Sequence, residues 1–105
     1  MQRFTFHNHG RRFAMAAVLT LAALSAHAAD IVIGQVAPLS GVLASTGRDM
    51  VLGAKIYFDH VNASGGVNGS KIRHVVVDDA YKVDETVRLT QELIEKQQAV
   101  ALIGF

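Results

Sequence analysis

The spacing of hydrophobic positions after the first 29 residues predicts alternating strands and helices. Three short runs are rich in β-branched and other apolar residues, which is typical of buried strands, and they cover residues 31–36, 71–78 and 99–105. Between them, apolar residues recur at every third or fourth position over 48–63 and from Thr86 to about Gln98, as in amphipathic helices. Each helix is long enough to connect parallel strands, so the pattern predicts a βαβαβ unit of an open, doubly wound α/β sheet.

Short sequence signals indicate where the first helix begins and ends. Thr46 with Asp49 three residues later resembles a capping box, so we expect Thr46 to cap the helix. At the other end, the glycines of Ser64-Gly65-Gly66 can adopt the left-handed conformation that closes a helix. The stretch 37–47 (APLSGVLASTG) is therefore expected to be a loop between the first strand and the first helix.

The first 28 residues have the three parts of a secretory signal peptide. A start with arginines and no acids precedes an apolar core, FAMAAVLTLAALSA, and Ala26-His27-Ala28 fits a signal peptidase site. The core is too short to span a bilayer, which needs about 20 apolar residues. An ordinary buried helix and twin-arginine export are the alternatives. We expect cleavage before Ala29 by general secretion, which in a bacterium with two membranes gives a periplasmic domain of residues 29–105.

Charge and cysteine content narrow the function classes. Cleavage would remove three of the ten basic residues, which leaves seven basic and nine acidic residues. The mature chain therefore has no excess of basic residues that would favour nucleic-acid binding. Because the chain has no cysteine, disulfides, a thiol nucleophile and a lipid anchor on cysteine are excluded. No cofactor motif is present, and we expect neither a cofactor nor a membrane anchor. The sequence closes on an apolar strand with no helix behind it, so we expect an N-terminal piece of a longer protein.

Two loops are candidates for ligand binding, and their direction along the chain distinguishes them. NASGGVNGS (62–70) runs from a helix into a strand, whereas phosphate loops run from a strand into a helix, so we interpret it as a turn. SGVLASTG (40–47) runs from a strand into a helix, at the sheet edge where open α/β sheets bind ligands. Ser45 and Thr46 offer hydroxyls there, beside the amides of a helix N-terminus. A simple helix cap is the alternative for Thr46.

Asp78 and Asp79 end the second strand, and such a pair of acids could bind a metal ion or act in catalysis. Paired carboxylates can hold magnesium or act as acid and base, but no third acid or lysine completes such a site, so turn formation and helix positioning are favoured. Tyr81 follows at the same sheet edge and is expected to face a cleft. The histidines His60 and His74 lack a second ligand at a spacing that suits a metal site.

Taken in order, these segments resemble the periplasmic substrate-binding proteins of ABC importers, in particular the leucine/isoleucine/valine-binding type. The P-L-S-G loop, the N-x-x-G-G-x-N-G-x-K-I turn and the D-D-x-Y stretch carry the resemblance, which covers the mature chain. It implies the N-terminal part of one lobe of a two-lobed type I fold that closes on a small molecule without chemistry. The implied ligand is a branched-chain amino acid or a related small carboxylate, and the implied partner is an ABC permease in the inner membrane.

The resemblance also suggests site residues. Thr46 matches a position where members place an aromatic or polar residue over the ligand, and the main contacts to the ligand's carboxylate and ammonium groups come just after Phe105. The candidate ligand-binding residues are therefore Thr46, Ser45, Tyr81 and Phe105. The chain departs from the family at Lys82-Val83, where members often have a proline, and this weakens the expected cap of the second helix, which Asp84 could start instead.

Two other function classes remain open at this stage. An extracytoplasmic ligand-sensing domain of a receptor or regulator can use the same fold, and a membrane helix or signalling domain further along the chain would favour it. An exported hydrolase would need a nucleophile or a set of metal ligands that the sequence does not show.

Overall fold

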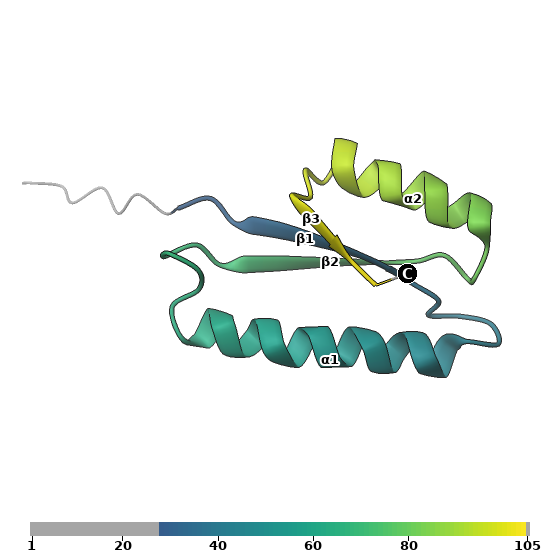
Figure 1. Cartoon of the computed structure of the whole chain (residues 1–105), viewed down its shortest axis with the longest axis horizontal. Helices are drawn as coiled ribbons and strands as arrows, with labels where there is room; N and C mark the ends of the chain where they lie inside the picture. The colour runs from purple at the N-terminus through teal and green to yellow at the C-terminus, as the bar shows by residue number, and fades with distance from the viewer. Residues whose placement is uncertain (1–27, 105) are drawn as a thin grey trace, which may run out of the picture.

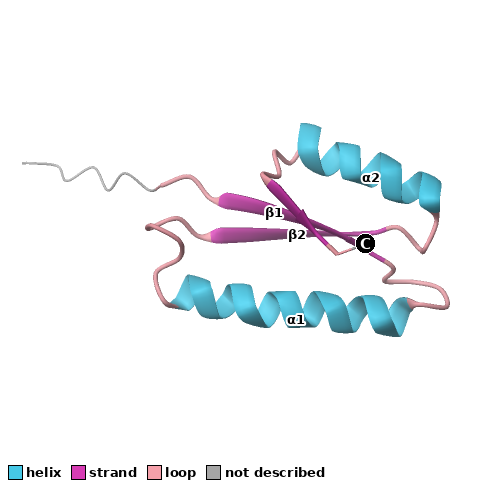
Figure 2. Ribbon diagram, in the orientation of Figure 1, coloured by secondary structure: helices cyan, strands magenta, loops and turns pink. Residues whose placement is uncertain are grey.

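The computed structural model describes residues 28–104 of the 105-residue chain. Three strands alternate with two helices, as Figures 1 and 2 show: β1 (Ile31–Ala37), α1 (Ala44–Ala63), β2 (Ile72–Asp78), α2 (Val83–Glu95) and β3 (Ala101–Ile103). The predicted βαβαβ order is confirmed. Apart from Ala28, the predicted signal peptide lies outside the described residues, and so does Phe105. No helix between residues 28 and 104 is long and apolar enough to cross a membrane.

All three strands are parallel, and β1 lies at the centre of the sheet in the order β2-β1-β3. β2 pairs with β1 over its whole length, from Ile31 opposite Ile72 to Ala37 opposite Asp78. Figure 1 shows α1 on one face of the sheet and α2 on the other, which is the doubly wound arrangement. The strands thus share an amino edge, where they begin, and a carboxyl edge, where they end.

The face of the sheet under α2 holds the tightest apolar packing. Leu89 and Leu93 lie four residues apart on α2 and are buried with Val36 of β1. Apolar side chains of β2 and of the β3 region surround them: Val75, Val77, Ala99 and Leu102. Gly34 lets this layer close, because a Cβ at its position would lie 2.9 Å from side-chain carbons of both Leu93 and Leu102.

The opposite face, under α1, contains a polar contact. Gln35 of β1 is buried, and its side-chain oxygen accepts a hydrogen bond from Nε2 of His74 on β2 at 2.8 Å. Phe58 of α1 packs edge-on against the His74 ring, with the ring centroids 5.1 Å apart. Burial lowers the pKa of His74 below its usual 6.5, although the nearby Asp59 carboxylate opposes that shift. These contacts account for His74 as a packing residue between α1 and the sheet.

The predicted start of α1 is wrong. The helix begins at Ala44, and Thr46 lies inside its first turn rather than capping it, with no side-chain capping hydrogen bond at the helix start. The chain turns earlier because Gly41 adopts a φ of 78° and its carbonyl accepts a hydrogen bond from the Ala44 amide at 3.2 Å. Gly47 belongs to the helix: a Cβ there would lie 1.9 Å from the Pro38 carbonyl oxygen, so only glycine fits where the loop folds back.

The last two elements also differ from their predicted bounds. α2 spans Val83–Glu95, so it begins before Thr86 and ends before Gln98. Gln98 has a φ of 57°, which interrupts regular structure between α2 and β3. As a result β3 covers only 101–103 of the predicted 99–105.

The glycine-rich stretch 62–70 begins with the end of α1. The Gly66 amide donates to the Val61 carbonyl at 2.9 Å, and the Gly65 amide donates to the Asn62 carbonyl at 3.2 Å. This pair of bonds is the Schellman motif, which satisfies the last free carbonyls of a helix. The glycines therefore close α1, as predicted.

The same stretch then aims the chain into β2. Asn68-Gly69 has φ angles of 50° and 82°, and the amides of Val67 and Ser70 donate to each other's carbonyls, as in a type I′ turn. The side chain of Asn62 donates to the Ile72 carbonyl and accepts from the Ile72 amide, both at 2.8 Å, which fixes the start of β2. The predicted turn is confirmed, and it lies at the amino edge of the sheet.

Candidate ligand-binding site

A pocket lies at the carboxyl edge of the sheet, between the N-terminal ends of α1 and α2. Its volume of about 380 Å³ is within the roughly 300–1,000 Å³ of small-molecule pockets. It is lined by two apposed segments, the loop from β1 into α1 and the turn from β2 into α2: Pro38, Leu43, Thr46, Met50, Asp79, Tyr81, Val83 and Thr86. Doubly wound sheets bind ligands at this edge.

The first wall of the pocket consists of the loop 38–43 and the first turns of α1. The Arg48 guanidinium holds the loop against the helix by donating to the Leu39 carbonyl at 3.1 Å. Thr46 and Met50 lie four residues apart on α1, so their side chains lie on the same side of the helix and both reach the pocket.

The second wall is the turn Asp79-Ala80-Tyr81-Lys82 between β2 and α2. Ala80 and Tyr81 have φ angles of 50° and 59°, and the Lys82 amide donates to the Asp79 carbonyl at 2.9 Å, as in a type I′ turn. For residues with a Cβ, this left-handed conformation costs roughly 1–2 kcal/mol each. Such strain persists only where neighbouring groups hold the backbone in place.

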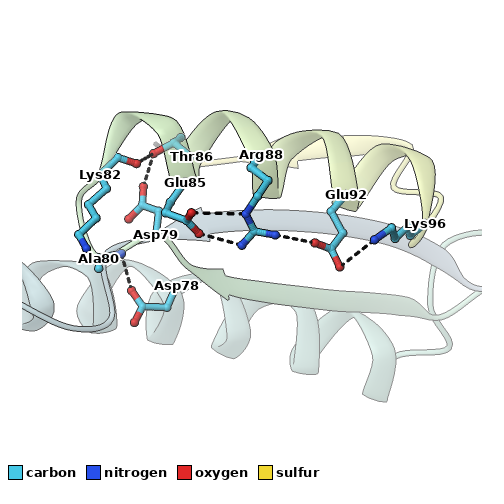
Figure 3. Close-up of polar contacts among 9 residues, drawn as sticks. All are labelled: Asp78, Asp79, Ala80, Lys82, Glu85, Thr86, Arg88, Glu92 and Lys96. Atoms are coloured by element: carbon cyan, nitrogen blue, oxygen red, sulfur yellow. Dashed lines mark hydrogen bonds and ion pairs between the residues drawn. The ribbon is translucent and has the colours of Figure 1, made fainter.

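The two aspartates supply the interactions that hold this turn. Asp78 Oδ1 accepts a hydrogen bond from the Ala80 amide at 2.8 Å, as Figure 3 shows, and Asp79 Oδ1 accepts one from the Tyr81 amide at 2.9 Å. Asp79 Oδ2 accepts a further bond from the Thr86 hydroxyl at 2.6 Å, which ties the turn to α2 (Figure 3). The aspartates thus form the turn and position α2, which is the role that the sequence favoured for them.

Asp78 also joins the two walls. Its Oδ1 accepts a second hydrogen bond from the Leu39 amide at 2.8 Å, across to the loop after β1. Hydrogen bonds from the Ser40 hydroxyl and from the Ala80 and Leu39 amides lower the pKa of Asp78 below its usual 3.8. The carboxylate is therefore ionised at neutral pH and links loop and turn in that state.

The pocket brings together two of the predicted ligand-binding residues. Thr46 from the first wall and Tyr81 from the second both line it. Ser45 is exposed and is not part of the lining, and Phe105 lies outside the described residues. The Tyr81 side chain is 66% exposed, so its ring is available to a bound molecule.

Sequence reasoning missed most of the apolar lining. The periodicity over 48–63 includes Met50 among the apolar positions of a helix, the loop 37–47 includes Leu43, and Val83 departs from the family's proline, but none of these patterns indicates a pocket. Two signals could have indicated the lining: Met50 follows Thr46 by one helical turn, and Thr86 is a hydroxyl residue one turn into the helix after the Asp78-Asp79 pair.

Among the polar residues that the structure describes, those outside this pocket form neither a metal site nor a charged ligand site on α2. Within residues 28–104, no three or more histidine, aspartate, glutamate or cysteine side chains gather in a way that could hold a metal ion. Along α2 and the residue that follows it, charged side chains form a ladder of ion pairs on the exposed surface (Figure 3): Glu85, Arg88, Glu92 and Lys96. Solvent screens exposed pairs of this kind and they add little stability, so the ladder indicates a solvated helix face.

Comparison with known proteins finds related sequences. Residues 30–105 match the family described as periplasmic binding protein. An amino acid binding protein of Pseudomonas aeruginosa is 39% identical over 89 residues, which cover 84% of this chain and 24% of that protein.

Two solved structures share the fold. The branched-chain amino acid transporter substrate binding protein LivJ of Streptococcus pneumoniae, in complex with isoleucine, is 32% identical with a TM-score of 0.70, over 72% of this chain and 22% of that one. An ABC transporter solute binding protein of R. palustris, in complex with benzoate, is 33% identical with a TM-score of 0.61, over 71% of this chain and 20% of that one. The chain thus spans about a quarter or less of each relative.

Proposed function

Because the chain belongs to the periplasmic binding protein family, we propose that it forms the N-terminal part of the first lobe of a solute-binding protein for an ABC importer. The solute is a branched-chain amino acid or a related small carboxylate, and the protein delivers it to an ABC permease in the inner membrane. Residues 1–28 serve as a cleaved signal peptide and the protein acts in the periplasm, in line with the family to which residues 30–105 belong.

The pocket at the carboxyl edge of the sheet is the observation that carries this proposal. Thr46 and Tyr81 face it from opposite walls, and most of the remaining lining is apolar. The isoleucine held by the LivJ relative and the benzoate held by the R. palustris relative both combine a carboxylate with an apolar group. A lining of this kind suits the apolar part of such a molecule. Ser45 and Phe105 are proposed as further contacts to the ligand.

Calorimetry on the complete product of the reading frame that encodes this chain, called the complete protein below, tests the proposal. After removal of co-purified solutes by unfolding and refolding, we expect L-leucine, L-isoleucine, L-valine or benzoate to bind with a Kd of about 10 μM or tighter. The same ligand should raise the Tm, because it binds only the folded state. A complete protein that binds no small solute contradicts the proposal.

The 105-residue chain by itself provides a matched control. It spans only 24% of the length of the P. aeruginosa relative, and Tyr81 and Val83 of its pocket are 66% and 81% exposed. We therefore expect binding to this chain to be weaker than about 1 mM. A membrane helix or signalling domain in the complete protein would favour the ligand-sensing alternative.

A further inference from the structure

Tyr81 lines the pocket with its backbone held at a positive φ of 59°. We propose that Tyr81 determines ligand selectivity at this wall: its ring packs against the apolar group of the bound solute, and Asp79 and Thr86 position it. This inference rests on the proposed function and goes further, because it states which end of the ligand faces this wall of the pocket and which residues select its size.

The geometry of the turn fixes the direction of the Tyr81 Cα–Cβ bond. Its own amide is bound by Asp79 Oδ1 at 2.9 Å, and the following Lys82 amide is bound by the Asp79 carbonyl at 2.9 Å. Asp79 is itself 7% exposed and is tied to α2 through Thr86 at 2.6 Å. Because these bonds hold the backbone on both sides of Tyr81, ligand binding does not first have to order the turn, which favours selective contact.

The charge of the wall indicates which end of the ligand it meets. Asp79 is the one charged residue that lines the pocket in the described part of the chain, and its two oxygens accept bonds from the Tyr81 amide and the Thr86 hydroxyl. A fixed negative charge disfavours a carboxylate placed nearby. The carboxylate of the solute therefore lies away from this wall, and its apolar group faces Tyr81, Met50 and Val83.

The exposure of Tyr81 also indicates that the apolar group of the solute packs on its ring, and a second exposed tyrosine serves as a control. Tyr81 is 66% exposed, so most of its ring remains uncovered until a ligand packs on it. Tyr57 on α1 is 63% exposed but is not part of the pocket lining, and it lies in a regular helix. The two tyrosines thus have similar exposure, and only one of them lies at the pocket.

The first experiment measures selectivity in the complete protein by calorimetry with L-isoleucine, benzoate and L-alanine as probes. Tyr81→Ala should weaken the affinity for isoleucine or benzoate by about tenfold or more. The affinity for alanine should change by less than about threefold. Tyr81→Phe, which keeps the ring, and Tyr57→Ala should leave the ratio of affinities for large and small probes within about twofold. An unchanged ratio in Tyr81→Ala would overturn the inference.

The second experiment tests the positioning role of Thr86. Thr86→Val keeps the shape of the side chain but removes the hydroxyl that binds Asp79, so the ratio of affinities for large and small probes should fall by about threefold. Thr86→Ser restores a hydroxyl and should restore the ratio. An equal ratio in the valine and serine variants would contradict positioning through Asp79.

Asp79→Asn distinguishes the inference from direct binding of an ammonium group. If Asp79 bound the ammonium of an amino acid, this change would weaken isoleucine strongly and spare benzoate, and the inference would be overturned. We expect equal effects on both probes. A complete protein that binds a polar solute such as urea, but none of the apolar probes, would overturn the inference and leave the solute-binding function intact.

Discussion

The two edges of the sheet both turn the chain through positive φ angles, but they use different residues to do so. In the amino-edge turn that leads into β2, these angles fall on residue types that accept them readily: Gly65, Gly66, Asn68 and Gly69. At the carboxyl edge, Ala80 and Tyr81 adopt them, although their Cβ atoms disfavour the conformation.

The two turns are also held by different kinds of interaction. The amino-edge turn is closed by backbone hydrogen bonds, and Asn62 adds contacts to β2. The carboxyl-edge turn depends on carboxylates, because Asp78 and Asp79 each bind an amide of the strained pair. A turn whose residue types suit its shape needs no such support. Strain that is held by side chains is typical of ligand sites, and here it occurs at the edge with the pocket.

The largest effect is expected at the amino edge, from Gly66→Ala. A Cβ there would lie 2.1 Å from the Ser70 carbonyl oxygen, and Gly66 has a φ of 77°, so the turn would have to open as well as accept strain. We expect urea unfolding of the complete protein to show a loss of about 3 kcal/mol.

Gly69→Ala is the matched control for this change. Gly69 has a φ of 82°, but nothing lies within 4 Å of the position of its Cβ, so only the conformational term applies. The expected loss is about 1 kcal/mol. Equal losses in the two variants would show that the contact with Ser70 does not determine the shape of the amino edge.

The amino edge could be predicted from sequence and the carboxyl edge only in part. Periodicity predicted the order of strands and helices, and Asn68-Gly69 predicted its turn because the residue types themselves favour it. Thr46 was wrongly placed as a cap, since the chain already turns into α1 at Gly41, whose carbonyl accepts a hydrogen bond from the Ala44 amide. Asp78-Asp79 indicated a turn, but the residue types of Ala80 and Tyr81 argue against their conformation, so no local signal revealed its left-handed form.

Ala80→Gly tests whether the carboxyl edge is strained. Glycine accepts the φ of 50° at this position without a steric penalty, so the change should stabilise the complete protein by about 1 kcal/mol in urea unfolding. At the amino edge, Asn68 has the same φ but tolerates it, and Asn68→Gly should change stability by less than about 0.5 kcal/mol. If Ala80→Gly gives no gain over Asn68→Gly, the difference in strain between the edges is not real.

The smallest effect concerns pH and the carboxylate that joins the two walls. Hydrogen bonds from the Ser40 hydroxyl and from the Ala80 and Leu39 amides lower the pKa of Asp78 below 3.8, so its contribution to stability is present above that value and is lost as the pH falls through the lower, folded-state pKa. Asp78→Asn should therefore lower the Tm at about pH 6, and the difference from the unmodified protein should shrink towards about pH 3. The amino-edge turn contains no titrating side chain between Val67 and Ser70, so the Tm difference of Asn68→Gly should stay constant over this range. A difference that shrinks equally in both variants would mean that acid acts on the whole fold, and the carboxyl edge would not be the part held by ionised groups.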